Sequence, residues 1–83
     1  MRVQVRYFAS LREALGAQEA LVVEDGTTVA RLRDVLIARG GDYGVRLART
    51  RAVRCAVDQL IVDESAPLRD GIEVAFFPPV TGG

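Results

Sequence analysis

The end of the sequence carries its clearest chemical signal. In order, the last residues are Phe77, Pro78, Pro79, Val80, Thr81, Gly82 and Gly83. Consecutive prolines favour a stiff, extended exit from a folded body, and the glycines that follow let the backbone approach another molecule closely. A carboxylate at Gly83 is therefore suited to enter the active site of a second protein and react there, for example with a nucleotide phosphate. An inert, frayed end is the alternative.

Such a tail is long enough to reach a buried site but is a poor source of affinity. From Pro79, the residues up to Gly83 span roughly 13–14 Å when extended. Fixing their backbone costs on the order of 4–8 kcal/mol, because each ordered residue loses conformational freedom. We therefore expect a folded domain over residues 1–77 that docks on a partner, and a flexible tail over residues 78–83 that reacts.

Composition excludes several kinds of function. The chain has eleven arginines, eleven acidic residues, no lysine and no histidine, so its formal net charge is zero. A neutral chain lacks the electrostatic attraction on which nucleic-acid binding depends, and we expect no nucleic-acid partner. Without lysine and histidine, Schiff-base chemistry, Walker-type phosphate loops and histidine acid–base catalysis are excluded. Since there is also a single cysteine, we expect no metal site and no bound cofactor.

Several residues bear on the location of the protein. Arg2, Arg6, Arg12 and Glu13 interrupt the apolar positions near the N-terminus, so the pattern does not match a secretory signal peptide. The single Cys55 has no disulfide partner in the chain, which fits a reducing compartment. No apolar run approaches the roughly 18 residues of a membrane span. We therefore expect a cytoplasmic protein with no membrane partner.

Hydrophobic periodicity predicts a small α+β domain. Alternating or short apolar runs indicate strands, and apolar residues at three- and four-residue spacing after a capping Thr28 indicate one main helix. We expect strands over residues 2–8, 20–24, 53–57, 60–62 and 72–77, and helices over residues 9–15 and 28–39, with one further turn at 45–48. This order suits a mixed sheet with the main helix packed on it.

Strand alternation also predicts a docking patch. In the last strand Phe76 should face the core, which places Phe77 on the opposite, exposed face beside the tail. Phe8 lies on the polar face of the first strand in the same way, and either Leu60 or Ile61 must point outward. Burying one such group at an interface contributes roughly 1.5–3 kcal/mol, so a cluster of them could offset the ordering of the tail. The alternative is that each is an ordinary apolar residue on a surface.

Other polar or reactive residues have simpler interpretations. The guanidinium of Arg12 could pair with an acidic group of a partner, although a solvated arginine is the simpler case. Cys55 lies on the core side of an alternating strand, where we expect a buried and inert thiol. Arg31, Arg33 and Asp34 are expected to form the solvated face of the main helix.

The sequence resembles a known family over nearly its whole length. Residues 73–83, which read EVAFFPPVTGG, resemble the end of the small subunit of molybdopterin synthase, the MoaD family. Residues 5–16 resemble the first strand and short helix of that family, and residues 28–36 resemble its main helix. The resemblance implies a ubiquitin-like β-grasp fold. By position, it also implies that docking involves Phe8, Ile61 and Phe77, and it favours Ile61 over Leu60.

The resemblance implies a sulfur carrier that is not a complete enzyme by itself. An adenylyltransferase related to ubiquitin activators would consume ATP to form an acyl-adenylate on Gly83, and a sulfur donor system would convert that end to a thiocarboxylate. The tail would then insert into the large synthase subunit, which holds most of the active site, and deliver sulfur to cyclic pyranopterin monophosphate. Two carriers on a dimer of large subunits would form a heterotetramer.

Other functions fit the same tail. The sulfur could instead serve thiamine precursors, tRNA or cysteine synthesis, with the same adenylation step and a different partner. A ubiquitin-like modifier would join Gly83 to lysines of other proteins, although a chain without lysine cannot form lysine-linked chains with itself. In a plain interaction module, Gly82 and Gly83 would be dispensable.

Overall fold

The computed structural model describes residues 1–79, so the predictions for Val80, Thr81, Gly82 and Gly83 lie outside the described residues. The strands are β1 (Arg2–Tyr7), β2 (Gln18–Val22), β3 (Arg54–Val57), β4 (Leu60–Val62) and β5 (Glu73–Phe77). The helices are α1 (Ala9–Leu15), α2 (Val29–Ile37) and α3 (Gly41–Arg46). Within residues 1–79, no helix is long and apolar enough to cross a membrane.

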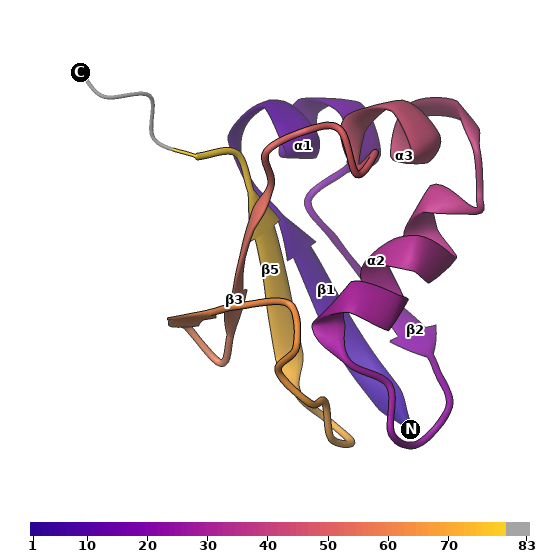
Figure 1. Ribbon diagram of the computed structural model, residues 1–83, viewed down its shortest axis with the longest axis vertical. Coiled ribbons are helices and arrows are strands. Elements are labelled where there is room, and N and C mark those ends of the chain that lie inside the picture. The colour runs from indigo at the N-terminus through magenta and orange to yellow at the C-terminus, as the bar shows by residue number, and fades with distance from the viewer. Residues whose placement is uncertain (80–83) are drawn as a thin grey trace.

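The strands form one mixed sheet in the order β2-β1-β5-β3-β4. The central strands β1 and β5 run parallel to each other, and every other neighbouring pair is antiparallel. Figure 1 shows that β5 ends beside α1, so the chain leaves the sheet at that end. The prediction of a mixed α+β sheet is confirmed.

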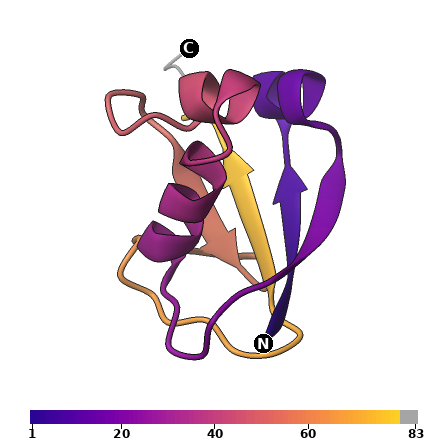
Figure 2. The ribbon, with the colours of Figure 1, turned by 90° about the vertical axis from the view of Figure 1, so that its right-hand side faces the viewer.

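The helices lie on one face of the sheet, with α2 crossing it and α1 and α3 at one end (Figure 2). Helix α2 begins where the Thr28 hydroxyl accepts a hydrogen bond of 3.3 Å from the Arg31 N–H, so the predicted cap is confirmed. The helix ends at Ile37, earlier than predicted, and Gly40 with φ of 75° then reverses the chain into α3. Helix α3 replaces the single turn predicted at 45–48.

The core lies between the helices and the sheet. Its best buried members, which come from both layers, are Val3, Val5, Tyr7, Val29, Leu32, Leu36, Leu47, Ile72, Val74 and Phe76. The alternation predicted for the first and last strands is therefore confirmed. The rings of Tyr7 and Phe76 stack with their centroids 6.5 Å apart, which joins the two parallel central strands. This face of the sheet therefore forms part of the hydrophobic core.

The predicted bounds of four strands are wrong by one or two residues. Strand β1 ends at Tyr7 rather than at residue 8, and β3 begins at Arg54 rather than at residue 53. Strand β2 covers Gln18–Val22 rather than 20–24, because its partner β1 begins at Arg2, which lies opposite Val22. Strand β5 begins at Glu73 rather than at residue 72. On α2, Val35 was expected among the apolar members facing the core, but it is 50% exposed.

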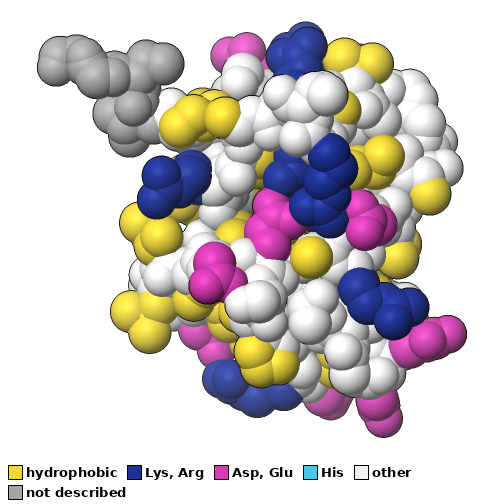
Figure 3. Space-filling view, viewed as in Figure 1, with side chains coloured by type: hydrophobic (Ala, Val, Ile, Leu, Met, Phe, Trp, Pro, Cys, Tyr) yellow, Lys and Arg dark blue, Asp and Glu magenta, His cyan; other side chains and the backbone are white. Residues whose placement is uncertain are grey.

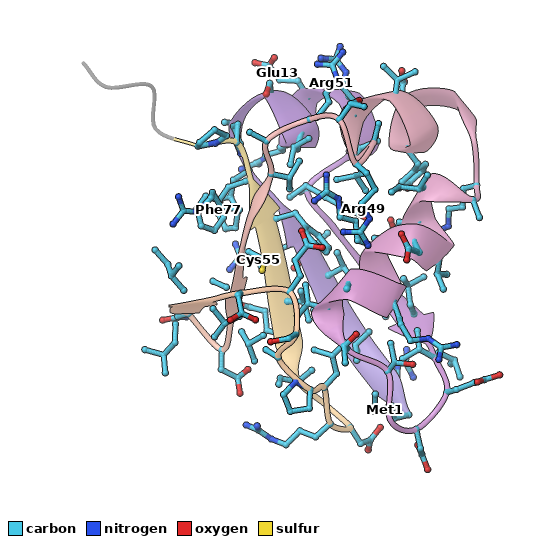
Figure 4. The ribbon with its side chains drawn as sticks, in the orientation of Figure 1. Met1, Glu13, Arg49, Arg51, Cys55 and Phe77 are labelled. Atoms are coloured by element: carbon cyan, nitrogen blue, oxygen red, sulfur yellow. The ribbon has the colours of Figure 1, made fainter. Side chains whose placement is uncertain are left out.

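The prediction of a solvated Arg33 is wrong, because this side chain is only 4% exposed. Its Nε donates to the carbonyl oxygen of Leu47 at 2.8 Å, and Nη2 donates to that of Ala48 at 2.7 Å. Its Nη1 pairs with Glu64 at 2.6 Å. Arg49, labelled in Figure 4, also pairs with Glu64. The buried guanidinium thus holds the loop after α3 against α2.

Candidate functional site

The face of the sheet opposite the helices carries a row of residues that strand register brings together. Ile61 of β4 lies opposite Ala56 of β3, and Ala56 lies opposite Ala75 of β5. Ala75 in turn lies opposite Arg6 of β1. Since residues one position away on these strands, such as Phe76, point into the core, this row belongs to the bare face.

These residues and their neighbours form a groove of about 500 Å³. Its lining consists of Arg6, Phe8, Ala56, Gln59, Ile61, Glu73, Ala75 and Phe77. The floor is made by Ala56 and Ala75, which are 6% and 7% exposed although no helix covers them, because the longer side chains around them shield them. In Figure 3, hydrophobic side chains follow the left-hand edge of the molecule below the grey residues. Such a groove suits an apolar group of a partner.

Phe8 stands at the junction of β1 and α1 and is 38% exposed. Its N–H donates to the carbonyl oxygen of Phe76 at 3.2 Å, which fixes its backbone to the end of β5. The next residue, Ala9, has φ of 52°, in the left-handed region that residues other than glycine rarely adopt. The Arg6 guanidinium carbon lies 5.2 Å from the centre of the Phe8 ring, within the range of a cation–π contact. The ring is therefore held at the groove.

Leu60 and Ile61 are both exposed, at 71% and 66%, because β4 is a short strand at the edge of the sheet. Alternation required only that one of them point outward. The register separates them, since Ile61 lies opposite Ala56 on the groove side, whereas Leu60 lies opposite Val57 and points the other way. The structure thus places Ile61, and not Leu60, in the lining of the groove, and its part in docking stays a prediction.

Phe77 was expected to be exposed or nearly so, and it is instead half-buried because it lines the groove. Figure 4 shows its side chain on the side of β5 that faces away from the helices. Pro78 and Pro79, which follow it directly, are also half-buried. The chain therefore leaves the sheet from the groove itself.

Known proteins are similar to this sequence over nearly its full length. The family model described as the ThiS family matches residues 5–83. The chain belongs to the ThiS family. The molybdopterin synthase sulfur carrier subunit of Escherichia coli strain K12 is 41% identical over 81 residues, which make up 98% of this chain and 99% of that protein. The subunit of the same name from Mycobacterium tuberculosis is 39% identical over 85 residues and covers 100% of this chain and 99% of that protein.

Solved structures show that this member of the ThiS family has the ubiquitin-like β-grasp fold, as predicted. The solution structure of the HVO 2177 protein of Haloferax volcanii matches with a TM-score of 0.84 and 30% identity, over 100% of this chain and 87% of that one. A chain in the complex of subunits 1 and 2 of the molybdopterin-converting factor from Helicobacter pylori matches with a TM-score of 0.69 and 24% identity, over 100% of both chains.

Several groove residues were not singled out from the sequence. Arg6 lies on the polar face predicted for the first strand, where it looked like any solvated residue. Ala56 and Gln59 gave no signal, because their place at the groove depends on β3 lying next to β5. Arg12 is exposed on α1 but does not line the groove, and its pairing with a partner stays a prediction.

Cys55 is buried, 3% exposed, on the core side of β3, as expected for a structural residue. Its thiol donates to the carbonyl oxygen of Val62 at 3.3 Å, and burial raises the pKa of the thiol above its usual value. The protonated thiol is a poor nucleophile, so the prediction of an inert thiol is supported. Among residues 1–79, no group of three or more His, Cys, Asp or Glu side chains is placed to hold a metal ion.

A second polar cluster lies on the helix-covered side and is satisfied internally. Glu19 of β2 accepts hydrogen bonds of 2.8 Å from the hydroxyls of both Tyr7 and Tyr43, and it pairs with Arg39 at 2.7 Å. Burial alone would raise the pKa of Glu19, but the hydrogen bonds from Arg39 and the tyrosines outweigh it and hold this pKa below the usual value. Burial and the neighbouring Glu19 raise the pKa of Tyr7. This cluster joins β1, β2 and α3 and serves the fold.

Proposed function

We propose that the chain carries sulfur on Gly83 for a molybdopterin synthase. The observation that supports this function most directly is the groove lined by Phe8, Ile61 and Phe77, because Phe77 directly precedes the proline segment of the tail. The groove offers a docking surface next to the reactive end. Identity of 41% and 39% to sulfur carrier subunits over the full length supports the same chemistry.

The reactive group in this proposal is the carboxyl group of Gly83. In an adenylyltransferase of the ubiquitin-activating type, a carboxylate oxygen attacks the α-phosphorus of ATP, so that an acyl-adenylate forms and pyrophosphate leaves. A donor system then supplies sulfur at the oxidation level of sulfide. Its attack on the acyl carbon releases AMP and leaves a thiocarboxylate. ATP is therefore consumed by the activating enzyme, and the carrier itself needs no bound cofactor.

The large synthase subunit would complete the active site. In Helicobacter pylori, a chain of this fold occurs in a complex of subunits 1 and 2 of the molybdopterin-converting factor. In our proposal the groove binds the large subunit while the tail, from Pro78 to Gly82, enters its active site. The sulfur then passes to cyclic pyranopterin monophosphate. Two carriers on a dimer of large subunits make a heterotetramer, and the carrier is not catalytic alone.

The energetics of docking fit a folded body that binds the partner and a tail that reacts. Burial of one apolar group at an interface contributes about 1.5–3 kcal/mol, so Phe8, Ile61 and Phe77 together can offset the roughly 4–8 kcal/mol for ordering the tail. Arg6 and Glu73 pair with each other at 3.7 Å, so an apolar group entering the groove leaves neither charge without a partner. Arg12 on α1 would add a pair with an acidic group of the partner.

The experiment that tests the function is to delete the codon for Gly83 from the chromosomal copy and to measure molybdopterin. We expect molybdopterin to be lost, because the carboxyl group no longer reaches the reaction sites. The same strain carrying the full-length gene on a plasmid is the control. The purified shortened chain should melt at the same temperature as the full chain, because the buried core described among residues 1–79 is left complete.

Normal molybdopterin in the deletion strain would contradict this function. If thiamine, thiolated tRNA or cysteine synthesis fell instead, the chain would carry sulfur for another pathway. Covalent adducts with other proteins on immunoblots, lost with Gly83, would identify a ubiquitin-like modifier. If the shortened chain melted much lower, the loss of molybdopterin would reflect folding and not tail chemistry.

A further inference from the structure

In the turn between β3 and β4, Gln59 adopts a backbone conformation that glutamine does not favour. Because Val57 pairs with Leu60, only Asp58 and Gln59 connect the two strands. Their φ angles are 46° and 71°, both in the left-handed region. Turns of this kind strongly prefer Gly, Asn or Asp, since a Cβ atom meets steric conflict there and the short polar side chains of Asn and Asp can offset it by local hydrogen bonds. Gln59 therefore destabilises the hairpin compared with glycine.

The side chain of Asp58 accounts for its own place in the turn. Its Oδ1 accepts from the Glu73 N–H at 3.1 Å, and its Oδ2 pairs with Arg69 at 2.7 Å. These contacts hold the hairpin against the start of β5. By contrast, no hydrogen bond links the side chain of Gln59 to any residue in the range 1–79. Within the described part of the chain, the side chain of Asp58 therefore stabilises the turn and that of Gln59 forms no hydrogen bond.

Gln59 lines the groove, where the other polar side chains already have partners. Arg6 and Glu73 form an ion pair with each other, and the remaining lining is apolar. A carboxamide carries both a hydrogen-bond donor and an acceptor, which is the complement of a peptide group. At the rim of an apolar groove it can therefore bind the main chain of a segment whose side chain enters the groove.

We propose that Gln59 is a specificity-determining residue of the docking groove. Its carboxamide hydrogen-bonds a main-chain peptide group of the large synthase subunit, and an apolar side chain from the same segment lies over Ala56 and Ala75. Phe77, which lines the groove, directly precedes the tail that this subunit would receive, and the two charged lining residues pair with each other. Both observations argue for an apolar occupant from the same partner. This inference rests on the proposed function.

Two variants separate docking from folding, with the large synthase subunit encoded in the same genome as the probe. Gln59→Leu keeps a long side chain at the strained position and removes the hydrogen bonds, whereas Gln59→Gly removes both the hydrogen bonds and the strain. By isothermal titration calorimetry, both variants should bind the subunit about tenfold more weakly. Gln59→Gly should melt at a higher temperature than the parent, and Gln59→Leu should not. If Gln59 served only the turn, Gln59→Gly would not both raise the stability of the chain and lower its affinity for the large subunit.

A matched control keeps the inference separate from the proposed function. If Phe77→Ala weakens binding and Gln59→Leu binds like the parent chain, the role of Gln59 is overturned and the docking groove stands. If Phe77→Ala also binds normally, or if the parent chain does not bind the large subunit, the docking site itself is overturned and the role of Gln59 with it. A lower melting temperature for Gln59→Gly would overturn the argument from strain.

Discussion

Phe76 and Phe77 are neighbours in β5, and they belong to two different surfaces. Phe76 is 0% exposed and stacks on Tyr7 under the helices. Phe77 lines the groove on the bare face, directly before the tail. Because successive residues of a strand point to opposite faces, one strand supplies both the core and the docking surface. A sheet with helices on one side can thus change its partner surface without changing its core.

The polar residues of the two faces differ in the same way. On the helix-covered face, Arg33 and Glu19 have their hydrogen-bonding groups engaged by residues of the same chain. On the groove side, the Gln59 side chain makes no hydrogen bond within residues 1–79. The unused hydrogen-bonding group and the partly exposed rings therefore line the same groove, with Gln59 at the hairpin end and Phe77 at the tail end. This difference distinguishes a binding surface from a structural one.

The largest effect should follow from Phe76→Ala. Removing a fully buried ring loses its transfer free energy and leaves a cavity, so the free energy of unfolding should fall by about 3–5 kcal/mol. Urea denaturation followed by circular dichroism measures this loss. Phe76→Leu, which fills most of the volume, is the matched control and should lose much less. A loss below about 1 kcal/mol for Phe76→Ala would show that this face is not the core.

The matching change, Phe77→Ala, should act on docking. We expect the Kd for the large synthase subunit to rise by about tenfold to a hundredfold, which corresponds to roughly 1.5–3 kcal/mol of lost burial. The free energy of unfolding should fall by less than about 1 kcal/mol, since Phe77 is only half-buried and no helix packs over it. If Phe77→Ala instead unfolded the chain as strongly as Phe76→Ala, the division between the two faces would be wrong.

Features that depend on nearby residues could be predicted from the sequence. The alternation of Val3, Val5 and Tyr7 fixed the core side of β1, and the same rule placed Phe76 and Phe77 on opposite faces. The cap of α2 at Thr28 also depends on local chemistry. Strand ends could not be predicted as well, because β2 ends opposite Arg2, where β1 begins, and not where its own apolar run stops.

Features that depend on distant residues could not be predicted in this way. Arg33 was predicted to be solvated because it lies on the polar face of the predicted main helix. Its burial depends on the carbonyl groups of Leu47 and Ala48, which lie in a loop beyond α3. The groove floor needs Ala56 and Ala75 side by side, which follows from β3 pairing with β5. The hydrophobic pattern does not predict strand order, so the sequence predicted only those groove residues that have large apolar side chains.

The smallest effect should come from the polar cluster on the helix-covered face. Glu19 has a pKa below its usual value in the folded state, so its ionised form stabilises the fold above the unfolded pKa. This contribution should be lost as the pH falls through the lowered folded pKa. Glu19→Gln should therefore lower the free energy of unfolding by about 1 kcal/mol at neutral pH, because Glu19 and Arg39 are partly open to solvent. Urea denaturation at several pH values should show the difference between parent and variant shrinking in acid. A difference in the free energy of unfolding that stayed constant down to acid pH would show that the ionised carboxylate does not stabilise the fold. The affinity of Glu19→Gln for the large subunit should equal that of the parent, since the cluster lies on the face opposite the groove.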